Sequence, residues 1–172
     1  MVAARTRAMS ANRLIDLEQD SLNPRTASRA LVTGALKRLD MLLMAGISLI
    51  VFFFAAAMLN TLTLLLSPVA AVMVIGYSYV ERFTWLTHFT LGLADSIAPA
   101  GGWIAVSGTL SWEGALLALA VAMWVGGFDL FYACQDISFD NAHGVHSIPQ
   151  RFGVVVAFKV ARVMHTITSL AL

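Results

Sequence analysis

The sequence predicts an all-α fold, a polytopic bundle of transmembrane helices. Of its 172 residues, 59% are hydrophobic and 12% are charged, whereas an ordinary soluble domain has about 25% charged residues. The mean hydropathy is +0.78. A chain with so few polar side chains cannot coat a water-soluble globule, so we expect membrane lipid to surround it.

Five apolar segments are each long enough to cross a bilayer, which requires roughly 20 apolar residues in a helix. They cover residues 41–59, 62–80, 88–107, 114–134 and 154–172. Pro68 lies in the second segment and Pro99 in the third. Because membrane helices tolerate proline where neighbouring groups satisfy the freed backbone, we expect these two helices to kink rather than end.

The positions of the basic residues predict the orientation of the chain. Lys and Arg occur in segments 21–38, 81–82 and 136–151, but the connections 60–61 and 108–112 contain neither. Basic loops face the cytoplasm in membrane proteins. Four predicted spans separate the two acidic clusters described below, so we expect both clusters on the cytoplasmic face of a bacterial inner membrane.

Charge and cysteine content exclude several classes of function. The formal net charge is +1, which gives no basic field for a nucleic-acid partner. Cys134 is the one cysteine in the sequence, so the chain has neither an intrachain disulfide nor a CxxC metal or redox motif.

The first acidic cluster contains Asn12, Asp16 and Asp20, each four residues from the next. In a helix, residues at this spacing are neighbours on one face. Carboxylate and amide oxygens are the ligands that Mg²⁺ prefers. A solvated helix end would show the same pattern, so the cluster alone leaves both interpretations open.

Asn23-Pro24 follows the first cluster and should end its helix, because proline cannot continue a helical hydrogen-bond ladder. Arg25 and Arg29 come next, again four residues apart. Guanidinium groups suit bidentate contacts with phosphate oxygens. The alternative is that these arginines only fix the membrane orientation of the chain.

The second acidic cluster contains Asp129, Tyr132, Asp136 and Asp140 and directly continues the fourth apolar segment. At about 100° per residue these positions form one narrow stripe of a helix. Carboxylates at the end of a membrane helix are costly and usually functional. The alternative is an amphipathic exit helix whose acidic residues face water.

Together the two clusters predict a site for Mg²⁺ and a diphosphate. Two acidic stripes on one membrane face can bind two or more Mg²⁺ ions, which would hold a diphosphate between them. A diphosphate leaving group needs its negative charge neutralised, and metal ions do this as Lewis acids. The apolar spans would supply a chamber for a hydrocarbon tail.

The clusters resemble the two aspartate-rich motifs of the UbiA superfamily of membrane prenyltransferases, roughly N-D-x-x-D-x-x-x-D and D-x-x-Y-A-x-x-D-x-x-x-D. The second motif is present without a gap from Asp129 to Asp140. The resemblance covers essentially the whole chain and is closest to the 4-hydroxybenzoate polyprenyltransferase branch, including its menaquinone-pathway relatives. It rests on the stretches NRLIDLEQDSLNPRTASRAL, RFTWLTHFTLGLADSIAPAGGWIAVSG and GFDLFYACQDISFDNAHGVHSIPQRFG.

The resemblance implies an enzyme that transfers a polyprenyl group from polyprenyl diphosphate to an aromatic acid, 4-hydroxybenzoate, in ubiquinone or menaquinone biosynthesis. It implies that the cofactor Mg²⁺ is held by Asn12, Asp16, Asp20, Asp129, Asp136 and Asp140. The implied catalytic residues are Asp16, Asp20, Asp136 and Asp140. The implied substrate-binding residues are Asn12, Arg25, Arg29, Arg82, Asp129, Tyr132 and His146.

The chain departs from the family pattern at two positions and in length. Arg13 stands at the second position of the first motif, where the family has aspartate, and Glu81 stands where lysine is expected before Arg82. Family members are longer. We therefore expect residues 1–172 to be one partial prenyltransferase domain, a fragment that lacks the first and last spans and does not catalyse alone.

Alternative functions lie inside and outside the family. Within it, the acceptor could be a dihydroxynaphthoate, haem or chlorophyllide. A CDP-alcohol phosphotransferase would carry D-G-x-x-A-R, which does not occur in the sequence. A transporter or proton relay would need acidic residues at mid-membrane depth in several spans, and only Asp95 meets that requirement. A nonfunctional fragment is the remaining alternative.

Overall fold

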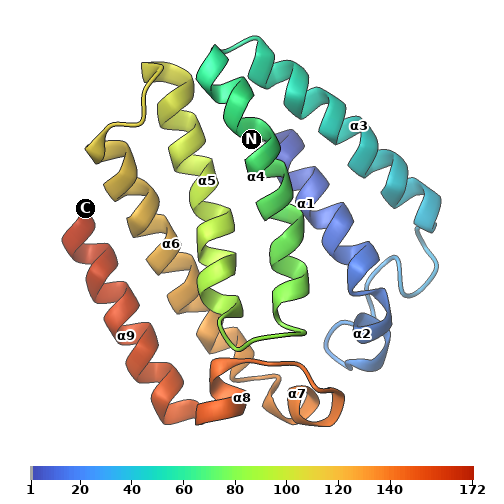
Figure 1. Ribbon diagram of the computed structural model, residues 1–172. Helices are drawn as coiled ribbons and strands as arrows, with labels where there is room; N and C mark the ends of the chain where they lie inside the picture. The colour runs from blue at the N-terminus through green and yellow to red at the C-terminus, as the bar shows by residue number, and fades with distance from the viewer. Residues whose placement is uncertain (1) are drawn as a thin grey trace. The chain divides into compact units, whose positions relative to one another are not determined.

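The computed structural model describes residues 2–172, and within them it contains α-helices and no strands (Figure 1). This confirms the predicted all-α class. The helices are α1 (Val2–Ile15), α2 (Leu17–Leu22), α3 (Arg38–Ala57), α4 (Thr61–Val80), α5 (Thr87–Ser107), α6 (Trp112–Ala133), α7 (Ile137–His143), α8 (Ile148–Phe152) and α9 (Val154–Ala171).

Five of these helices, α3, α4, α5, α6 and α9, are long and apolar enough to cross a membrane. They match the five predicted spans within a few residues at each end. Pro68 lies inside α4 and Pro99 inside α5, so the prediction that both helices continue through proline is confirmed. Apolar side chains on the spans are exposed, for example Ile50 at 71% and Leu65 at 71%, which gives these helices a surface suited to lipid.

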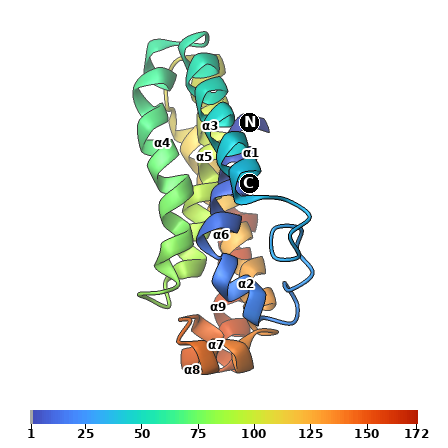
Figure 2. The same ribbon diagram turned by 90° about the vertical axis from the view of Figure 1, so that its right-hand side faces the viewer.

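The described chain divides into two compact units, one that ends at Ser78 and one that begins at Tyr79. In the first unit, α1 and α3 lie side by side, and α2 continues from the end of α1 (Figure 2). The Arg7 guanidinium donates a hydrogen bond to the carbonyl of Ala71 at 3.0 Å. This bond ties α1 to α4.

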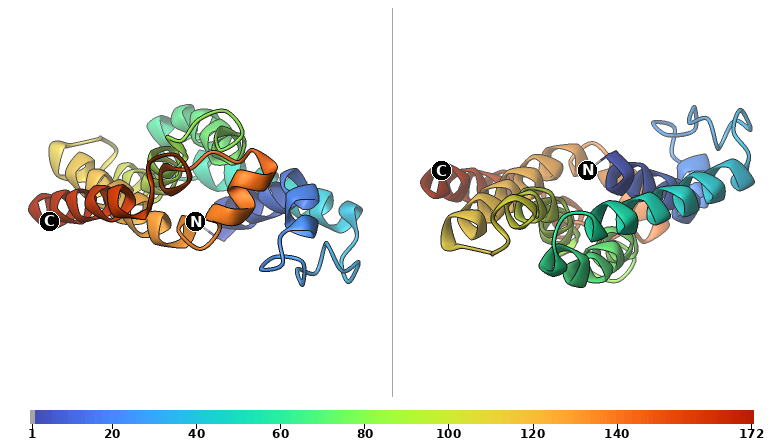
Figure 3. Two further views of the ribbon diagram at one scale, coloured as in Figure 1. Left: turned by 90° about the horizontal axis from the view of Figure 1, so that it is seen from below. Right: turned by 90° about the horizontal axis from the view of Figure 1, so that it is seen from above.

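In the second unit, α6 packs between α5 and α9, and the short helix α8 packs against α9 (Figures 1 and 3). Its buried core contains Leu130, Ile148, Ala157, Ala161 and Met164. Because α8 contributes Ile148 to the same core as α6 and α9, the segment that follows the second motif is anchored to the transmembrane helices.

Glycines allow α5 and α6 to meet backbone to backbone. A Cβ atom added to Gly126 would lie 2.7 Å from the carbonyl oxygen of His88, and one added to Gly92 would collide with the carbonyl of Ala122. Small residues permit such close approach between membrane helices. The contact at Gly126 sets His88 on α5 beside the end of α6, where Asp129 follows three residues later.

Candidate active site

The first motif lies at a break between two helices. α1 ends at Ile15, and Asp16 has φ −96° and ψ 11° before α2 begins. The expected single helix through the motif is therefore wrong. The i to i−4 hydrogen bonds between the motif residues are kept across the break. The amide of Asp16 donates to the Asn12 carbonyl at 2.9 Å, and that of Asp20 donates to the Asp16 carbonyl at 2.7 Å.

Asn12 and Asp16 are in direct contact across this break. The Asn12 amide nitrogen donates to the Asp16 carboxylate and also to the Ser78 hydroxyl, the latter at 3.3 Å. Asp16 is buried, with 8% of its surface exposed. The structure thus brings these two predicted ligands together.

Asp20 is buried and forms ion pairs with two arginines. Its carboxylate accepts a hydrogen bond from the Arg29 guanidinium, and the Arg13 Nη1 atom lies 3.7 Å from Asp20 Oδ2. Burial lowers the pKa of Arg13 and nearby Arg29 adds to this effect, while the carboxylates of Asp20 and Asp16 raise it. Arginine remains charged under ordinary conditions, so both guanidiniums balance the Asp20 charge.

The prediction that the first motif's helix ends at Asn23-Pro24 is confirmed, because α2 ends at Leu22. The backbone amide of Arg25 donates to the Asn23 side-chain oxygen at 2.9 Å. The Thr26 hydroxyl donates to the Asp20 carbonyl at 2.9 Å. These bonds fold the loop back over Asp20, which places Arg29 on that carboxylate and leaves Arg25 exposed.

The second motif also has a helix break at its middle aspartate. α6 ends at Ala133, Asp136 has φ −103° and ψ 5°, and α7 begins at Ile137. The prediction of one continuous stripe from Asp129 to Asp140 is therefore also wrong. Aspartate competes for backbone hydrogen bonds and disfavours helix interiors, which is consistent with the middle aspartate of each motif lying at a junction between helices.

Asp140 corresponds to Asp20 in this geometry and is also buried, with 5% of its surface exposed. The Ser147 hydroxyl donates to Asp140 Oδ2 at 2.9 Å, and the Val145 amide donates to the Asp140 carbonyl at 3.1 Å. Gly144 ends α7 with φ 68°, a left-handed conformation that glycine adopts without steric cost. The reversal at Gly144 brings Ser147 back to Asp140.

Asp129, on α6, contacts a residue that the motif pattern does not contain. Its Oδ2 atom lies 2.7 Å from His88 Nδ1, and the His88 side chain is almost fully buried. No spacing rule relates positions 88 and 129, because the pair depends on how α5 packs against α6. The sequence signal was limited to a histidine at the start of an apolar span.

The remaining predicted substrate-binding residues are placed as follows. Tyr132 is half exposed, and its ring packs edge-on against Phe128 with 5.2 Å between centroids. The Arg82 guanidinium lies 5.6 Å from the Tyr79 ring centroid. The His146 amide donates to the Glu81 carbonyl at 2.8 Å, and its Nδ1 atom is buried without a hydrogen-bond partner.

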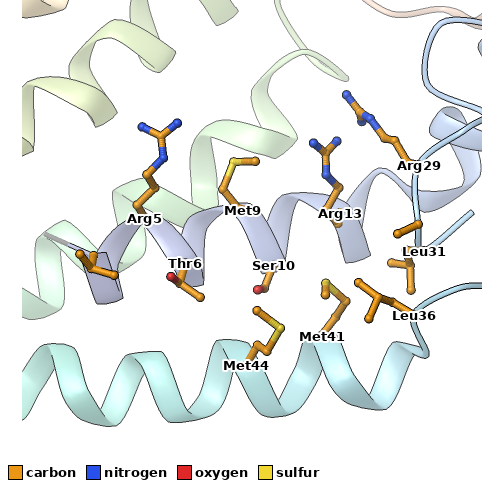
Figure 4. Close-up of a pocket in the computed structure, with 12 residues that line it drawn as sticks. Arg5, Thr6, Met9, Ser10, Arg13, Arg29, Leu31, Leu36, Met41 and Met44 are labelled. Atoms are coloured by element: carbon orange, nitrogen blue, oxygen red, sulfur yellow. The ribbon is translucent and has the colours of Figure 1, made fainter.

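A cavity of about 500 Å³ lies in the first unit. Arg5 lines it, although no sequence pattern had marked Arg5 as a binding residue. Arg5 and Arg13 extend from the same side of α1, and Arg29 lies beside Arg13 (Figure 4). The apolar part of the lining includes Met9, Leu31, Leu36, Met41 and Met44. Guanidinium groups beside apolar walls suit a ligand that has an anionic head and a hydrocarbon tail.

No three His, Cys, Asp or Glu side chains among residues 2–172 are grouped closely enough to hold a metal ion. The first motif lies in one unit and the second in the other.

Comparison with known proteins identifies the family. A model of the UbiA prenyltransferase family matches residues 1–172. The chain belongs to the UbiA prenyltransferase family. With five helices able to cross a membrane, this UbiA-family chain is an integral membrane protein.

Two relatives of this UbiA-family chain are 4-hydroxybenzoate octaprenyltransferases. The protein from Aliivibrio fischeri is 32% identical over 142 residues, which are 83% of this chain and 50% of the relative. The protein from Nitrosomonas eutropha is 33% identical over 153 residues, or 88% of this chain and 53% of the relative. The chain thus spans about half the length of these curated relatives.

A solved structure shares the fold. The apo structure of a UbiA homolog from Aeropyrum pernix K1 matches with a TM-score of 0.92 and 36% sequence identity. The match covers 99% of this chain and 65% of that structure. The described helices therefore have the UbiA arrangement.

The bond from Ser147 to Asp140 generates a stability prediction. Ser147→Ala should lower the thermal unfolding midpoint in detergent, because a buried carboxylate loses a donor at a cost of about 1–3 kcal/mol. Ser138→Ala is the matched control, since Ser138 is exposed on α7, and it should leave the midpoint unchanged. Equal midpoints for the two variants would contradict the proposed bracing of Asp140.

Proposed function

We propose that this UbiA-family chain provides both acidic motifs of an enzyme that transfers a polyprenyl group from polyprenyl diphosphate to 4-hydroxybenzoate. The observation that carries the proposal is the repeated geometry of the motifs. In each one the middle aspartate lies at a helix junction and the last aspartate is buried, Asp20 at 6% and Asp140 at 5% exposure. The names of the relatives, 4-hydroxybenzoate octaprenyltransferases, support this acceptor.

The donor atoms of the two motifs fit Mg²⁺. Carboxylate and amide oxygens are hard ligands, and ionised carboxylates that are buried need a cation or hydrogen-bond donors to offset their desolvation. We infer that Mg²⁺ is held by Asn12, Asp16, Asp20, Asp129, Asp136 and Asp140. When bound, the ions neutralise charge on the leaving diphosphate as Lewis acids.

The arginines would hold the diphosphate beside the motifs. Arg25 is exposed and can turn toward a phosphate, while Arg29 must exchange its bond with Asp20 for a phosphate oxygen. Arg82 would be the third phosphate contact. A bidentate guanidinium contact fixes the orientation of the diphosphate as well as its charge.

Prenyl transfer at this site proceeds by cleavage of the allylic carbon–oxygen bond, whose electron pair leaves with the diphosphate. The ring carbon next to the acceptor hydroxyl forms the new carbon–carbon bond, and a ring proton is then lost. Tyr132 would line the acceptor position, and His146 would contact substrate. Holding the acceptor against the allylic carbon supplies part of the rate enhancement by proximity.

The roles of the middle aspartates can be tested by charge removal. In the complete enzyme, with the remaining spans present, Asp16→Asn and Asp136→Asn should each lower transfer of a labelled polyprenyl group to 4-hydroxybenzoate by roughly 100-fold or more, as loss of a preorganised charge contact does. Glu18→Gln is the control, because Glu18 is exposed on α2 between the motif aspartates, and it should retain activity.

The same assay, run with 4-hydroxybenzoate and with a dihydroxynaphthoate, shows which of the two is the acceptor. Transfer to a dihydroxynaphthoate but not to 4-hydroxybenzoate would keep the reaction class and replace the substrate. Near-normal activity of either aspartate variant at limiting Mg²⁺ would contradict the role of that residue.

We propose further that both motifs face the cytoplasm in a bacterial inner membrane. α3, α4, α5 and α6 lie between them in the chain, and an even number of crossings returns the chain to the same side. Single cysteines at exposed Ser21 and Asn141, in a Cys134→Ser background, should react with an impermeant thiol reagent from the same side of inverted vesicles. Labelling from opposite sides would contradict a shared site.

A further inference from the structure

His88 is a buried polar residue that the proposed reaction does not use. It lies at the start of α5 with 1% of its surface exposed. A buried imidazole must satisfy both ring nitrogens or lose free energy of folding. Here both nitrogens have partners, one on α6 and one at the start of α8.

The partners of His88 determine its tautomer. The Ile148 backbone amide can only donate, and it lies 3.3 Å from His88 Nε2, so Nε2 is the acceptor. The single proton of the neutral ring is then on Nδ1, which lies 2.7 Å from Asp129 Oδ2. The ring therefore donates its Nδ1–H to the Asp129 carboxylate.

Segment Val145–Ile148 extends this arrangement to Asp140. Two of its residues bond to Asp140: the Val145 amide donates to the Asp140 carbonyl and the Ser147 hydroxyl to the Asp140 carboxylate. The His146 amide donates to the Glu81 carbonyl. The Ile148 amide donates to His88 Nε2. The segment is mostly buried. The first and last carboxylates of the second motif are thus held through one continuous set of hydrogen bonds.

We propose that His88 is a positioning residue of the second motif, which orients the Asp129 carboxylate for Mg²⁺ and diphosphate through its Nδ1–H. The inference rests on the proposed function, since it deepens the role of the same site. Hydrogen-bond partners of metal-binding groups typically change metal affinity 10- to 100-fold when removed. His88 reaches Asp129 because Gly126 on α6 has no side chain to keep the α5 backbone at a distance.

Two amide substitutions separate the two contacts of the ring. In His88→Asn the side-chain nitrogen takes the place of Nδ1 and can still donate to Asp129, but it cannot reach Ile148. In His88→Gln the longer side chain reaches the position of Nε2 and can accept from Ile148, but it loses the donor to Asp129. His143→Asn is the matched control, because His143 is exposed and its Nδ1 atom bonds to the Phe139 carbonyl of its own helix.

The experiment measures the rise in unfolding temperature that Mg²⁺ produces in the presence of inorganic pyrophosphate. His88→Gln should raise the half-effective Mg²⁺ concentration about 10- to 100-fold, whereas His88→Asn should shift it much less and His143→Asn not at all. Wild-type Mg²⁺ dependence in His88→Gln, or equal shifts in the Asn and Gln variants, would overturn the positioning role.

The proposed function fails in a different way from this inference. If the wild-type protein shows neither stabilisation by Mg²⁺ and pyrophosphate nor prenyl transfer, the site assignment is wrong and the role of His88 falls with it. If Mg²⁺ and pyrophosphate stabilise the wild-type protein and stabilise His88→Gln equally well, the site assignment stands and the positioning role of His88 alone is rejected.

Discussion

The burial of carboxylates in the two acidic motifs is the constraint on which the rest of the structure depends. Asp16, Asp20 and Asp140 are all buried, and an ionised carboxylate removed from water must be compensated by donors or cations. Each motif meets this requirement locally. The loop after α2 places Arg29 on Asp20, and the turn after α7 places Ser147 on Asp140.

Close packing of small residues makes this compensation possible in the second unit. Gly126 admits the backbone of α5 at His88, and Gly127 packs against the ring of His165 on α9. Bulkier residues would separate the helices and remove the imidazole from Asp129. Because lipid provides little hydrophobic drive for helix association, shape at these contacts has a large share in the stability of the bundle.

Sequence reasoning located the spans and both motifs, because apolar length and four-residue spacing are local properties of the chain. It missed the breaks at Asp16 and Asp136, because the four-residue spacing is the same whether or not the helix is interrupted. The Asp16 amide keeps its i to i−4 hydrogen bond, whereas the Asp136 amide donates to the Ala133 carbonyl, three residues earlier. It also missed the partners His88 and Arg13. Those contacts depend on tertiary packing and on a loop that folds back, neither of which a residue pattern encodes.

We propose that the two motifs together hold one diphosphate. Calorimetric titration of the purified protein with inorganic pyrophosphate at saturating Mg²⁺ tests this claim directly. We predict one bound pyrophosphate per chain, and loss of that binding in Asp20→Asn and in Asp140→Asn alike. Two pyrophosphates per chain, with one retained in each variant, would show that the motifs are separate sites and would contradict the claim.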